Sequence, residues 1–289
     1  MKRIPFTKMQ GIGNDYLYVD CTKKDLFEGR GAEEFARRFS DRHFGIGSDG
    51  VIVIRPSEKA DFRMEMLNAD GSHGRMCGNG IRCLTRYVMD RGLTEKKTIT
   101  VETLSGIRVI STSIDESGKF CASVNMGKPS FFSKDIPVNR ESEVMINEAL
   151  NAAGSLYNVT AVSMGNPHAV IFTKDVERLD LARIGPYFEN HRLFPEGVNT
   201  EFAEVLSRQK IRMRVWERGS GETMACGTGA CATVAAGVMI GLTGRKVEVV
   251  LNGGSLYITW DDKNEEITMV GPAEFVFDGE VDFDPREEI

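Results

Sequence analysis

The tetrapeptide Cys77-Gly78-Asn79-Gly80 has a near copy at Cys226-Gly227-Thr228-Gly229, and each copy opens a segment with the pattern of a helix. A cysteine at the start of a helix lies among backbone N–H groups without intrahelical partners, at the positive end of the helix macrodipole. That position lowers the pKa of a thiol, and the neighbouring glycines let backbone N–H groups approach and hold an anion. The repeat therefore predicts one site built from two similar halves, with two thiols that move a proton from one face of a carbon to the other.

The composition is typical of a globular protein. The chain has 289 residues, of which 41% are hydrophobic and 27% charged, enough for one large or two ordinary domains. A net charge of −6 and the lack of a long basic run argue against nucleic acid or an anionic membrane surface as the partner. Because the N-terminus lacks an apolar signal-peptide core and no apolar run is long enough to span a membrane, we expect a cytoplasmic protein.

The cysteines are too sparse for a disulfide framework, since the chain has only six, and a reducing compartment would keep them as thiols. Zinc sites use close pairs such as Cys-x-x-Cys, whereas Cys77 and Cys83 are six positions apart and Cys226 and Cys231 five. We therefore expect no metal. The cysteines outside the two motifs are interpreted as packing residues: Cys21, Cys83, Cys121 and Cys231.

Hydrophobic periodicity shows the same plan in both halves of the chain. In the first half we expect strands at 16–20, 51–54, 61–67, 98–103, 107–112 and 120–124, and helices at 32–39 and at 81–88 with a stop at Gly92. In the second half we expect strands at 158–163, 169–172, 199–205, 211–216, 246–251, 255–260, 265–270 and 273–276, and helices at 181–191 and 230–240.

Strands outnumber helices, and short turns such as Asn252-Gly253-Gly254 join several of them. This predicts an α+β fold of two similar domains, each a curled, mostly antiparallel sheet around a central helix. The second central helix is small and apolar on all sides and should be buried. We expect a domain boundary within 125–135, which divides the chain into residues 1–126, joined by a C-terminal strand at 273–289, and residues 127–272, with the active site in the cleft between them.

A glycine-rich segment, Trp216-Glu217-Arg218-Gly219-Ser220-Gly221-Glu222-Thr223, lies just before the second cysteine motif. A surface ion pair between Glu217 and Arg218 would contribute little to stability. The glycines favour a binding loop instead, in which a guanidinium holds a substrate carboxylate at two points and the carboxylate holds an ammonium.

Several polar residues in turn-like settings are further candidates. His168 lies in the turn Gly165-Asn166-Pro167-His168, where a structural and a functional role are equally open. Asn14, Asn68 and Asn199 could simply be turn residues. The glycines at 11–13 and 45–50 form neither a dinucleotide fingerprint nor a P-loop, because the third glycine and the Gly-Lys-Ser/Thr ending are missing.

Taken together, these residues make the chain similar to diaminopimelate epimerases. The shared motifs span essentially the whole chain, in the order Lys8-Met9-x-Gly11-x-Gly13-Asn14-Asp15, Phe44-Gly45-Ile46-Gly47-x-Asp49, Asn68-Ala69-Asp70-Gly71-Ser72, Cys77-Gly78-Asn79-Gly80-x-Arg82-Cys83, Gly165-Asn166-Pro167-His168, Gly197-Val198-Asn199, Glu217-Arg218-Gly219 and Cys226-Gly227-Thr228-Gly229-Ala230. The resemblance implies a cofactor-independent isomerase that interconverts LL- and meso-2,6-diaminopimelate in lysine and peptidoglycan precursor synthesis. We expect a homodimer that acts on this small molecule.

The resemblance also implies roles by position. Cys77 and Cys226 are the base and acid pair, and His168 and Glu217 tune the thiols. The carboxylate at the reacting centre meets backbone N–H groups of Gly78, Asn79, Gly227 and Thr228, and its ammonium meets Glu217 and the main chain at Arg218. The distal end of the substrate is held by Asn14, Asn68, Asn166, Asn199 and the Arg218 side chain. Gly50 stands where some members have a substrate-binding glutamine, so that side-chain contact is absent or made by the main chain.

The chemistry is consistent with these roles, because removal of an α-hydrogen needs preorganised donors that hold the developing negative charge, as two helix N-termini can. Closure of the two domains would exclude water. A proline or hydroxyproline racemase-like enzyme uses the same two-thiol chemistry but usually has a histidine at the position of Asn79, and a histidine racemase on this scaffold is a further option. A thiol redox protein, with Cys77 and Cys226 as an exchangeable pair, is an alternative of another class; loss of a substrate α-hydrogen to D2O would argue against it.

Overall fold

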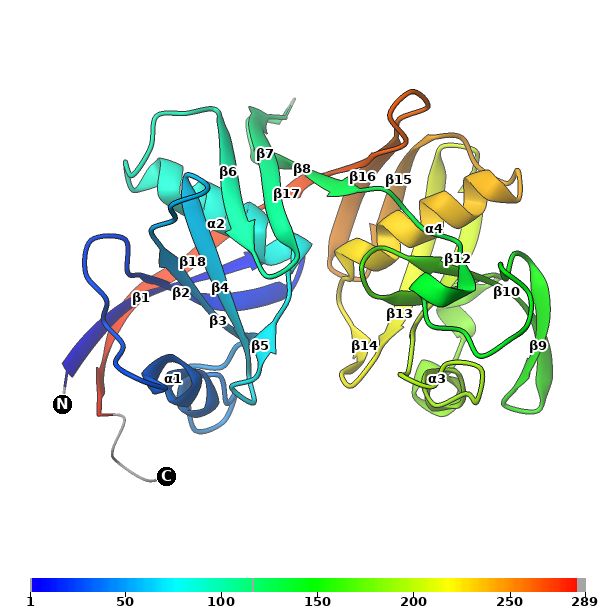
Figure 1. Ribbon diagram of the computed structural model, residues 1–289, viewed down its shortest axis with the longest axis horizontal. Coiled ribbons are helices and arrows are strands. Elements are labelled where there is room, and N and C mark those ends of the chain that lie inside the picture. The colour runs from blue at the N-terminus through cyan, green and yellow to red at the C-terminus, as the bar shows by residue number, and fades with distance from the viewer. Residues whose placement is uncertain (1, 116, 285–289) are drawn as a thin grey trace. The chain divides into compact units, whose positions relative to one another are not determined.

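The computed structural model describes residues 2–115 and 117–284 (Figure 1). Met1, Glu116 and the part of the expected C-terminal strand at 285–289 lie outside the described residues. The chain forms two compact units. Unit 1 runs up to Val124 and includes the segment from Gly271 onward, and unit 2 is Asn125–Val270.

Unit 1 is built from strands and two α-helices. Its elements are β1 Lys2–Gly11, β2 Asn14–Asp20, α1 Gly31–Phe39, β3 Gly50–Arg55, β4 Phe62–Asn68, β5 His73–Gly74, α2 Gly78–Asp90, β6 Thr98–Thr103, β7 Gly106–Ile114, β8 Phe120–Gly127, which ends in unit 2, and β18 Glu274–Phe283. Strand β18, in red, runs antiparallel beside β1, in blue, from Lys2↔Phe283 to Gln10↔Glu274 (Figure 1). The first and last described strands are therefore paired within one unit.

The strands of unit 1 pair mostly in antiparallel fashion, whereas β2 with β3 and β4 with β6 form parallel pairs. Strand β1 pairs with β2, and β2 pairs with β3 in parallel, with Tyr16 opposite Gly50. Helix α2 contacts β1, β2, β3, β7 and β18. On another face, α1 packs its aromatic side chains with the C-terminal strand, where the Phe35 and Phe283 rings meet edge to face at 5.4 Å between centroids.

Unit 2 repeats the combination of a sheet and a buried helix. Its elements are η1 Ser133–Asp135, β9 Glu148–Ala152, β10 Ser155–Ser163, β11 Pro167–Phe172, η2 Val176–Arg178, α3 Leu181–Glu189, β12 Asn199–Ser207, β13 Lys210–Glu217, β14 Gly221–Thr223, α4 Gly227–Met239, β15 Lys246–Leu251, β16 Gly254–Trp260 and β17 Ile267–Pro272, which ends in unit 1. The parallel pairs here are β11–β12 and β13–β15. Helix α4 is buried from Gly229 to Gly237, because its small apolar residues let β10, β11, β12 and β16 pack against it.

The expected α+β fold, with sheets around a central helix, is confirmed. Most elements differ from their expected bounds by a few residues, and two of these differences have a clear local cause. Helix α3 ends at Glu189 rather than at 191, because the Asn190 side chain donates to the Pro186 carbonyl and satisfies the last turn. Strand β17 begins at Ile267 rather than at 265, because Glu265 adopts a left-handed conformation, with a φ of 61°.

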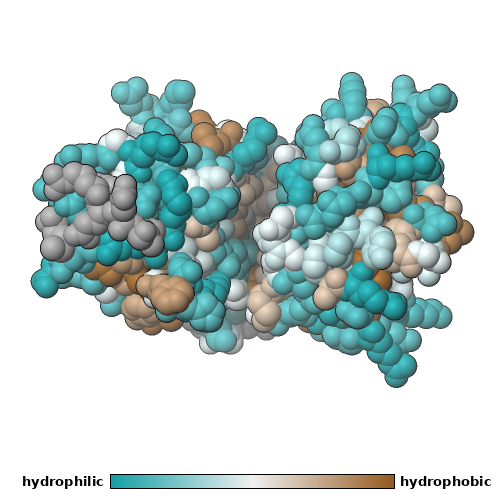
Figure 2. Space-filling model, turned by 90° about the horizontal axis from the view of Figure 1, so that it is seen from below, coloured by the Kyte–Doolittle hydropathy of each residue, from teal (hydrophilic) through white to brown (hydrophobic). Residues whose placement is uncertain are grey.

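The apolar residues of each unit are mostly interior. On the face drawn in Figure 2 the surface is largely hydrophilic, with hydrophobic residues in small separate patches. Within residues 2–115 and 117–284, no helix is both long enough and apolar enough to cross a membrane.

Candidate active site

Both cysteine motifs cap the central helix of their unit, as the sequence predicted. Cys77 and Cys226 have extended backbones, with φ and ψ of −123° and 119° and of −124° and 109°. The sulfur of Cys77 accepts the Gly80 N–H at 3.3 Å, and that of Cys226 accepts the Gly229 N–H at 3.4 Å. Each thiol thus takes the place that a serine or aspartate oxygen usually has at a helix N-cap.

The N–H groups proposed to hold an anion lie in the first turns of these helices. Backbone hydrogen bonds within α2 begin at Ile81, whose N–H donates to the Cys77 carbonyl, and those within α4 begin at Ala230. The N–H groups of the two preceding residues in each helix lie before these bonds, where a helix offers donors to a ligand. These residues are Gly78 and Asn79 in α2, and Gly227 and Thr228 in α4.

The third helical position is a glycine in both motifs because the space beside it is filled. A Cβ atom at Gly229 would lie 2.5 Å from Oε1 of Glu201, a carboxylate oxygen. A Cβ atom at Gly80 would lie 2.6 Å from Cδ1 of Ile52, the end of a flexible side chain. The same substitution should therefore cost more in α4 than in α2.

We expect Gly229→Ala to lower the free energy of unfolding by about 1–3 kcal/mol, the usual cost of overpacking a core, and Gly80→Ala to cost less. The reason is that the Glu201 carboxylate is already tied to His168 and cannot move aside as an isoleucine methyl can. Urea unfolding of the two variants measures the difference. Equal losses would show that the Glu201 carboxylate does not restrict this position.

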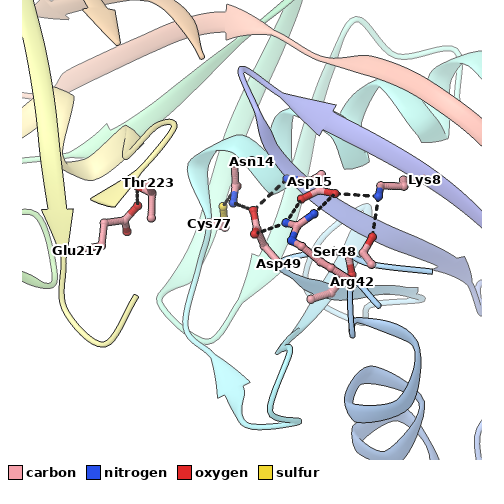
Figure 3. Close-up of polar contacts among 11 residues, drawn as sticks. Lys8, Asn14, Asp15, Arg42, Ser48, Asp49, Cys77, Glu217 and Thr223 are labelled. Carbon is pink, nitrogen blue, oxygen red and sulfur yellow. Dashed lines mark hydrogen bonds and ion pairs between the residues drawn. The ribbon is translucent and has the colours of Figure 1, made fainter. Parts of the chain in front are cut away.

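The surroundings of Cys77 contain the predicted Asn14, and Figure 3 shows the two side chains together. The Cys77 thiol donates to Asn14 Oδ1 at 3.1 Å. Of the other predicted residues in unit 1, Asn68 donates to the Ser72 hydroxyl at 2.9 Å. Asn79 is buried, and its Oδ1 has no hydrogen-bond partner among the described residues.

The surroundings of Cys226 are more acidic. Glu217 accepts a hydrogen bond from the Thr223 hydroxyl (Figure 3). Burial raises the pKa of Glu217. Burial also raises the pKa of the Cys226 thiol well above its ordinary value, and the charges of Glu217 and Glu201 add to this shift. The sequence prediction of a lowered thiol pKa is therefore wrong for Cys226, because desolvation outweighs the hydrogen bonds from the helix start and Thr228.

A chain of side-chain hydrogen bonds connects the predicted His168 to the Cys226 motif. His168 is fully buried, and its Nδ1 lies 2.7 Å from Oε1 of Glu201, which is also fully buried. On its other side, His168 Nε2 lies 3.0 Å from Asn166 Oδ1, and Asn166 Nδ2 donates to the Thr228 hydroxyl at 3.3 Å. That hydroxyl is 3.5 Å from the Cys226 sulfur. His168 and Asn166 therefore lie in one polar cluster with the thiol.

The predicted Asn199 and Arg218 are joined through the main chain. Asn199 donates to the Pro167 carbonyl at 2.8 Å and accepts the Arg218 N–H at 3.0 Å. The exposed Arg218 guanidinium donates to the Glu196 carbonyl at 2.8 Å. Its stem passes over Gly197, where a Cβ atom would lie 2.9 Å from Arg218 Cδ. The loop thus fixes the base of Arg218 and leaves its head accessible.

Two acidic residues of these clusters were missed at the sequence level. Asp49 belongs to a motif shared with the resembled family but received no role, and Glu201 was interpreted only as part of a strand. Glu201 gave no local signal, because a glutamate in an alternating strand is usually solvated.

Among the packing cysteines, Cys21, Cys83 and Cys231 are buried as expected, whereas Cys121 is only half-buried. Burial raises the pKa of Cys83 to about 12.

The described residues contain no group of three or more His, Cys, Asp or Glu side chains that could hold a metal ion. Around Cys77 in unit 1 and around Cys226 in unit 2, the described residues provide thiols, carboxylates, amides and backbone donors, with a histidine in unit 2. This set suits proton transfer and the binding of a small zwitterion.

Comparisons with known proteins agree with the motifs. The family model of diaminopimelate epimerase matches residues 6–132 and 160–276. The diaminopimelate epimerase of Desulfovibrio desulfuricans is 54% identical over 95% of this chain and 97% of its own, and that of Acetivibrio thermocellus is 50% identical over 96% and 98%.

Solved structures show the same fold at low identity. The phenazine biosynthesis protein of the PhzF family from Bacillus anthracis has a TM-score of 0.71 at 21% identity, covering 98% of this chain and all of its own. A hydroxyproline epimerase from Agrobacterium vitis has a TM-score of 0.70 at 14% identity, covering 99% and 93%. At this identity the likeness concerns the fold alone, and the family assignment comes from the sequence relatives. The chain belongs to the diaminopimelate epimerase family.

Proposed function

We propose that the protein is an isomerase that interconverts LL-2,6-diaminopimelate and meso-2,6-diaminopimelate by inverting one α-carbon, in lysine and peptidoglycan precursor synthesis. The observation that carries this proposal is the identity of about half of the residues to diaminopimelate epimerases over nearly the whole chain. The presence of a thiol at the start of each central helix supports a mechanism in which Cys77 and Cys226 remove and deliver the α-proton.

In this mechanism one cysteine takes the α-proton as a thiolate while the other delivers its thiol proton to the opposite face. The backbone N–H groups at the starts of α2 and α4 stabilise the charge that develops on the adjacent carboxylate. The charge of Glu217 acts on the Cys226 thiol, and we propose that Glu217 takes the thiol proton to generate the thiolate. His168, held by Glu201, orients Asn166 and through it the Thr228 hydroxyl beside Cys226.

The distal part of the substrate can be bound by the exposed Arg218 guanidinium and by asparagine side-chain amides. The guanidinium of Arg218 can hold the distal carboxylate, with Asn14, Asn68, Asn166 and Asn199 as further partners.

Gly50 has no side chain to contribute, and a Cβ atom there would lie 2.1 Å from the Leu67 carbonyl oxygen. Its φ of 159° is extended backbone. Close packing against β4, rather than backbone strain, therefore keeps this position a glycine.

The test is incubation of LL-diaminopimelate with the purified protein in D2O, followed by chiral separation and mass spectrometry of the products. We expect the meso isomer with one deuterium at the inverted carbon, without added cofactor. Proline, hydroxyproline and histidine serve as parallel substrates. Turnover of one of these in place of diaminopimelate would overturn the substrate assignment, and no α-deuterium in any of them would favour thiol redox chemistry.

We also propose that the protein is a homodimer. Strand β18 carries two large apolar side chains at the surface, Val276 with 51% and Phe277 with 45% of its area exposed. Pairing of such a strand face with a second copy would remove these side chains from water. Sedimentation analysis should give about twice the chain mass of 32.0 kDa. A single species with the mass of one chain would contradict the proposal.

A cytoplasmic location completes the proposal. All six cysteines are thiols, and a mechanism that uses two of them needs a compartment that keeps them reduced. Cell fractionation with detection of the protein by antibody tests this location. Recovery in a secreted or envelope fraction would contradict it.

A further inference from the structure

The amide of Asn14 has a defined orientation beside Cys77. Its Oδ1 accepts the hydrogen of the Cys77 thiol at 3.1 Å, and its Nδ2 donates to Asp49 Oδ2 at 2.6 Å (Figure 3). An ionised carboxylate only accepts hydrogen bonds, so Asp49 requires the N–H side of the amide. The oxygen of the amide is therefore turned toward the thiol.

Asp49 is itself held in place by cationic and backbone donors. Arg42 Nη2 donates to Asp49 Oδ1 at 2.8 Å and to Asp15 Oδ1 at 2.7 Å. The Asp15 N–H donates to Asp49 Oδ2 at 3.1 Å, and Lys8 Nζ lies 2.9 Å from Asp15 Oδ2. Figure 3 shows these side chains as one connected group. The carboxylate of Asp49 thus accepts from three donors and has little freedom to turn.

The fold explains why these residues meet. The turn at Ile12 and Gly13, both with positive φ, places Asn14 at the first position of β2. Strand β3 pairs with β2 in parallel and begins at Gly50, so Asp49 lies at the same end of the sheet as Asn14. Cys77 caps α2, which packs on β2 and β3.

We propose that Asp49 is a positioning residue, which holds the Asn14 amide oxygen toward Cys77 so that the resting Cys77 is a protonated thiol. The proposal rests on the proposed function, in which one cysteine must start as the acid. An amide oxygen accepts a hydrogen bond but takes no proton at neutral pH, so the proton stays on sulfur.

Four other titratable groups interact electrostatically with Cys77: Tyr16, Tyr18, Arg82 and Cys83. Burial raises the pKa of Tyr16 and Tyr18 well above the ordinary value, so both remain neutral at the pH of the experiment. Burial and the neighbouring Asp15 charge raise the pKa of Asp49. Asp49 lies one side chain away from the thiol, beyond Asn14, so the experiment must separate the effect of its charge from its effect on the Asn14 amide.

The test is the pH dependence of the reaction of Cys77 with iodoacetamide, followed by peptide mass spectrometry. In Asp49→Asn the residue at 49 can donate as well as accept, so the Asn14 amide can turn its N–H groups toward a thiolate. A hydrogen bond to the charged form favours that form. We expect the pH midpoint of Cys77 alkylation to fall by about one unit in this variant, which makes alkylation at pH 7 about tenfold faster. Cys121, half-buried in β8, is the reference and should not change.

Two controls separate orientation from charge. Asp15→Asn removes one carboxylate charge from the same cluster without contacting the Asn14 side chain, so its shift should be much smaller. Asn14→Ala removes the acceptor directly and should lower the midpoint as Asp49→Asn does. If Asp49 acts through Asn14, the double variant Asn14→Ala, Asp49→Asn should behave like Asn14→Ala alone. Asn14→Ala also leaves the carboxylates in place, should Asp49→Asn fail to fold.

Three outcomes would overturn the proposal: no fall in the Cys77 midpoint in Asp49→Asn and Asn14→Ala, equal shifts in Asp15→Asn and Asp49→Asn, or additive shifts in the double variant. Alkylation needs no turnover. A wild-type protein that fails to epimerise diaminopimelate would therefore overturn the proposed function while the role of Asp49 is still measured separately.

Discussion

Replacement of either Cys77 or Cys226 by serine should reduce kcat/KM for diaminopimelate by about 10²–10⁴-fold, the usual contribution of a general acid or base. A serine hydroxyl can accept the N–H of Gly80 or Gly229 as the sulfur does, so the helix cap is retained. The hydroxyl is, however, a far weaker acid than a thiol. In the proposed mechanism each thiol serves one face of the carbon, so both variants should lose activity. The assay is chiral analysis of the product together with deuterium uptake.

Cysteines outside the motifs provide the matched controls. Cys83→Ala removes a buried thiol from α2, and Cys121→Ala removes a half-buried thiol from β8. Both should retain most of the activity, although Cys83→Ala leaves a small cavity and lowers stability. Comparison of thermal unfolding for the serine and alanine variants separates loss of chemistry from loss of fold. Full activity in either Cys77→Ser or Cys226→Ser would contradict the two-thiol mechanism.

The elements that the sequence predicted are those with strong local patterns. The Cys-Gly-x-Gly repeat predicted both helix starts, because glycine and a capping side chain act within one turn of the chain. Strands β6 and β15 were predicted with their observed bounds, since each alternates apolar and polar residues between clear turns. Such features depend on residues that are close in sequence.

Pairing between distant segments could not be predicted from local patterns. Strand β1 was missed because Lys2–Gly11 begins with charged residues and a proline, and its strand character comes from β2 on one side and β18 on the other. Strand β9 was missed for a similar reason, because its short segment pairs only with β10 among the described strands. Tertiary pairing decides these segments more than propensity does.

The site shows the same division. The positions of the cysteines, His168 and Glu217 could be proposed from motifs, but their electrostatics could not. The helix start alone argued for a lowered thiol pKa, whereas the fold buries Cys226 beside two carboxylates, Glu217 and Glu201, and the pKa is raised. Asp49 acts through its contact with Asn14, and Glu201 through its contact with His168. Each of these contacts joins residues more than thirty positions apart in the chain.

Substitution of Arg218 by alanine should raise KM for diaminopimelate strongly and change kcat less. Loss of one partner of a buried charge pair costs about 2–5 kcal/mol, which corresponds to roughly a 30- to 4,000-fold weaker complex. The guanidinium is exposed and donates to one backbone carbonyl, that of Glu196, so its remaining N–H groups can meet the distal carboxylate of the proposed substrate. The reacting carbon lies elsewhere in the substrate, which is why the chemical step should be affected less.

Two variants make the Arg218 prediction specific. Arg218→Lys keeps the charge but loses the planar two-point contact, so its KM should lie between those of the wild type and Arg218→Ala. Arg208→Ala is the matched control, because Arg208 is also an exposed arginine of unit 2 that donates to a backbone carbonyl, that of Gly241. It should leave KM unchanged. An Arg218→Ala protein with the KM of the wild type would show that this arginine does not hold the substrate, and the distal carboxylate would then have to be bound by the asparagine amides alone.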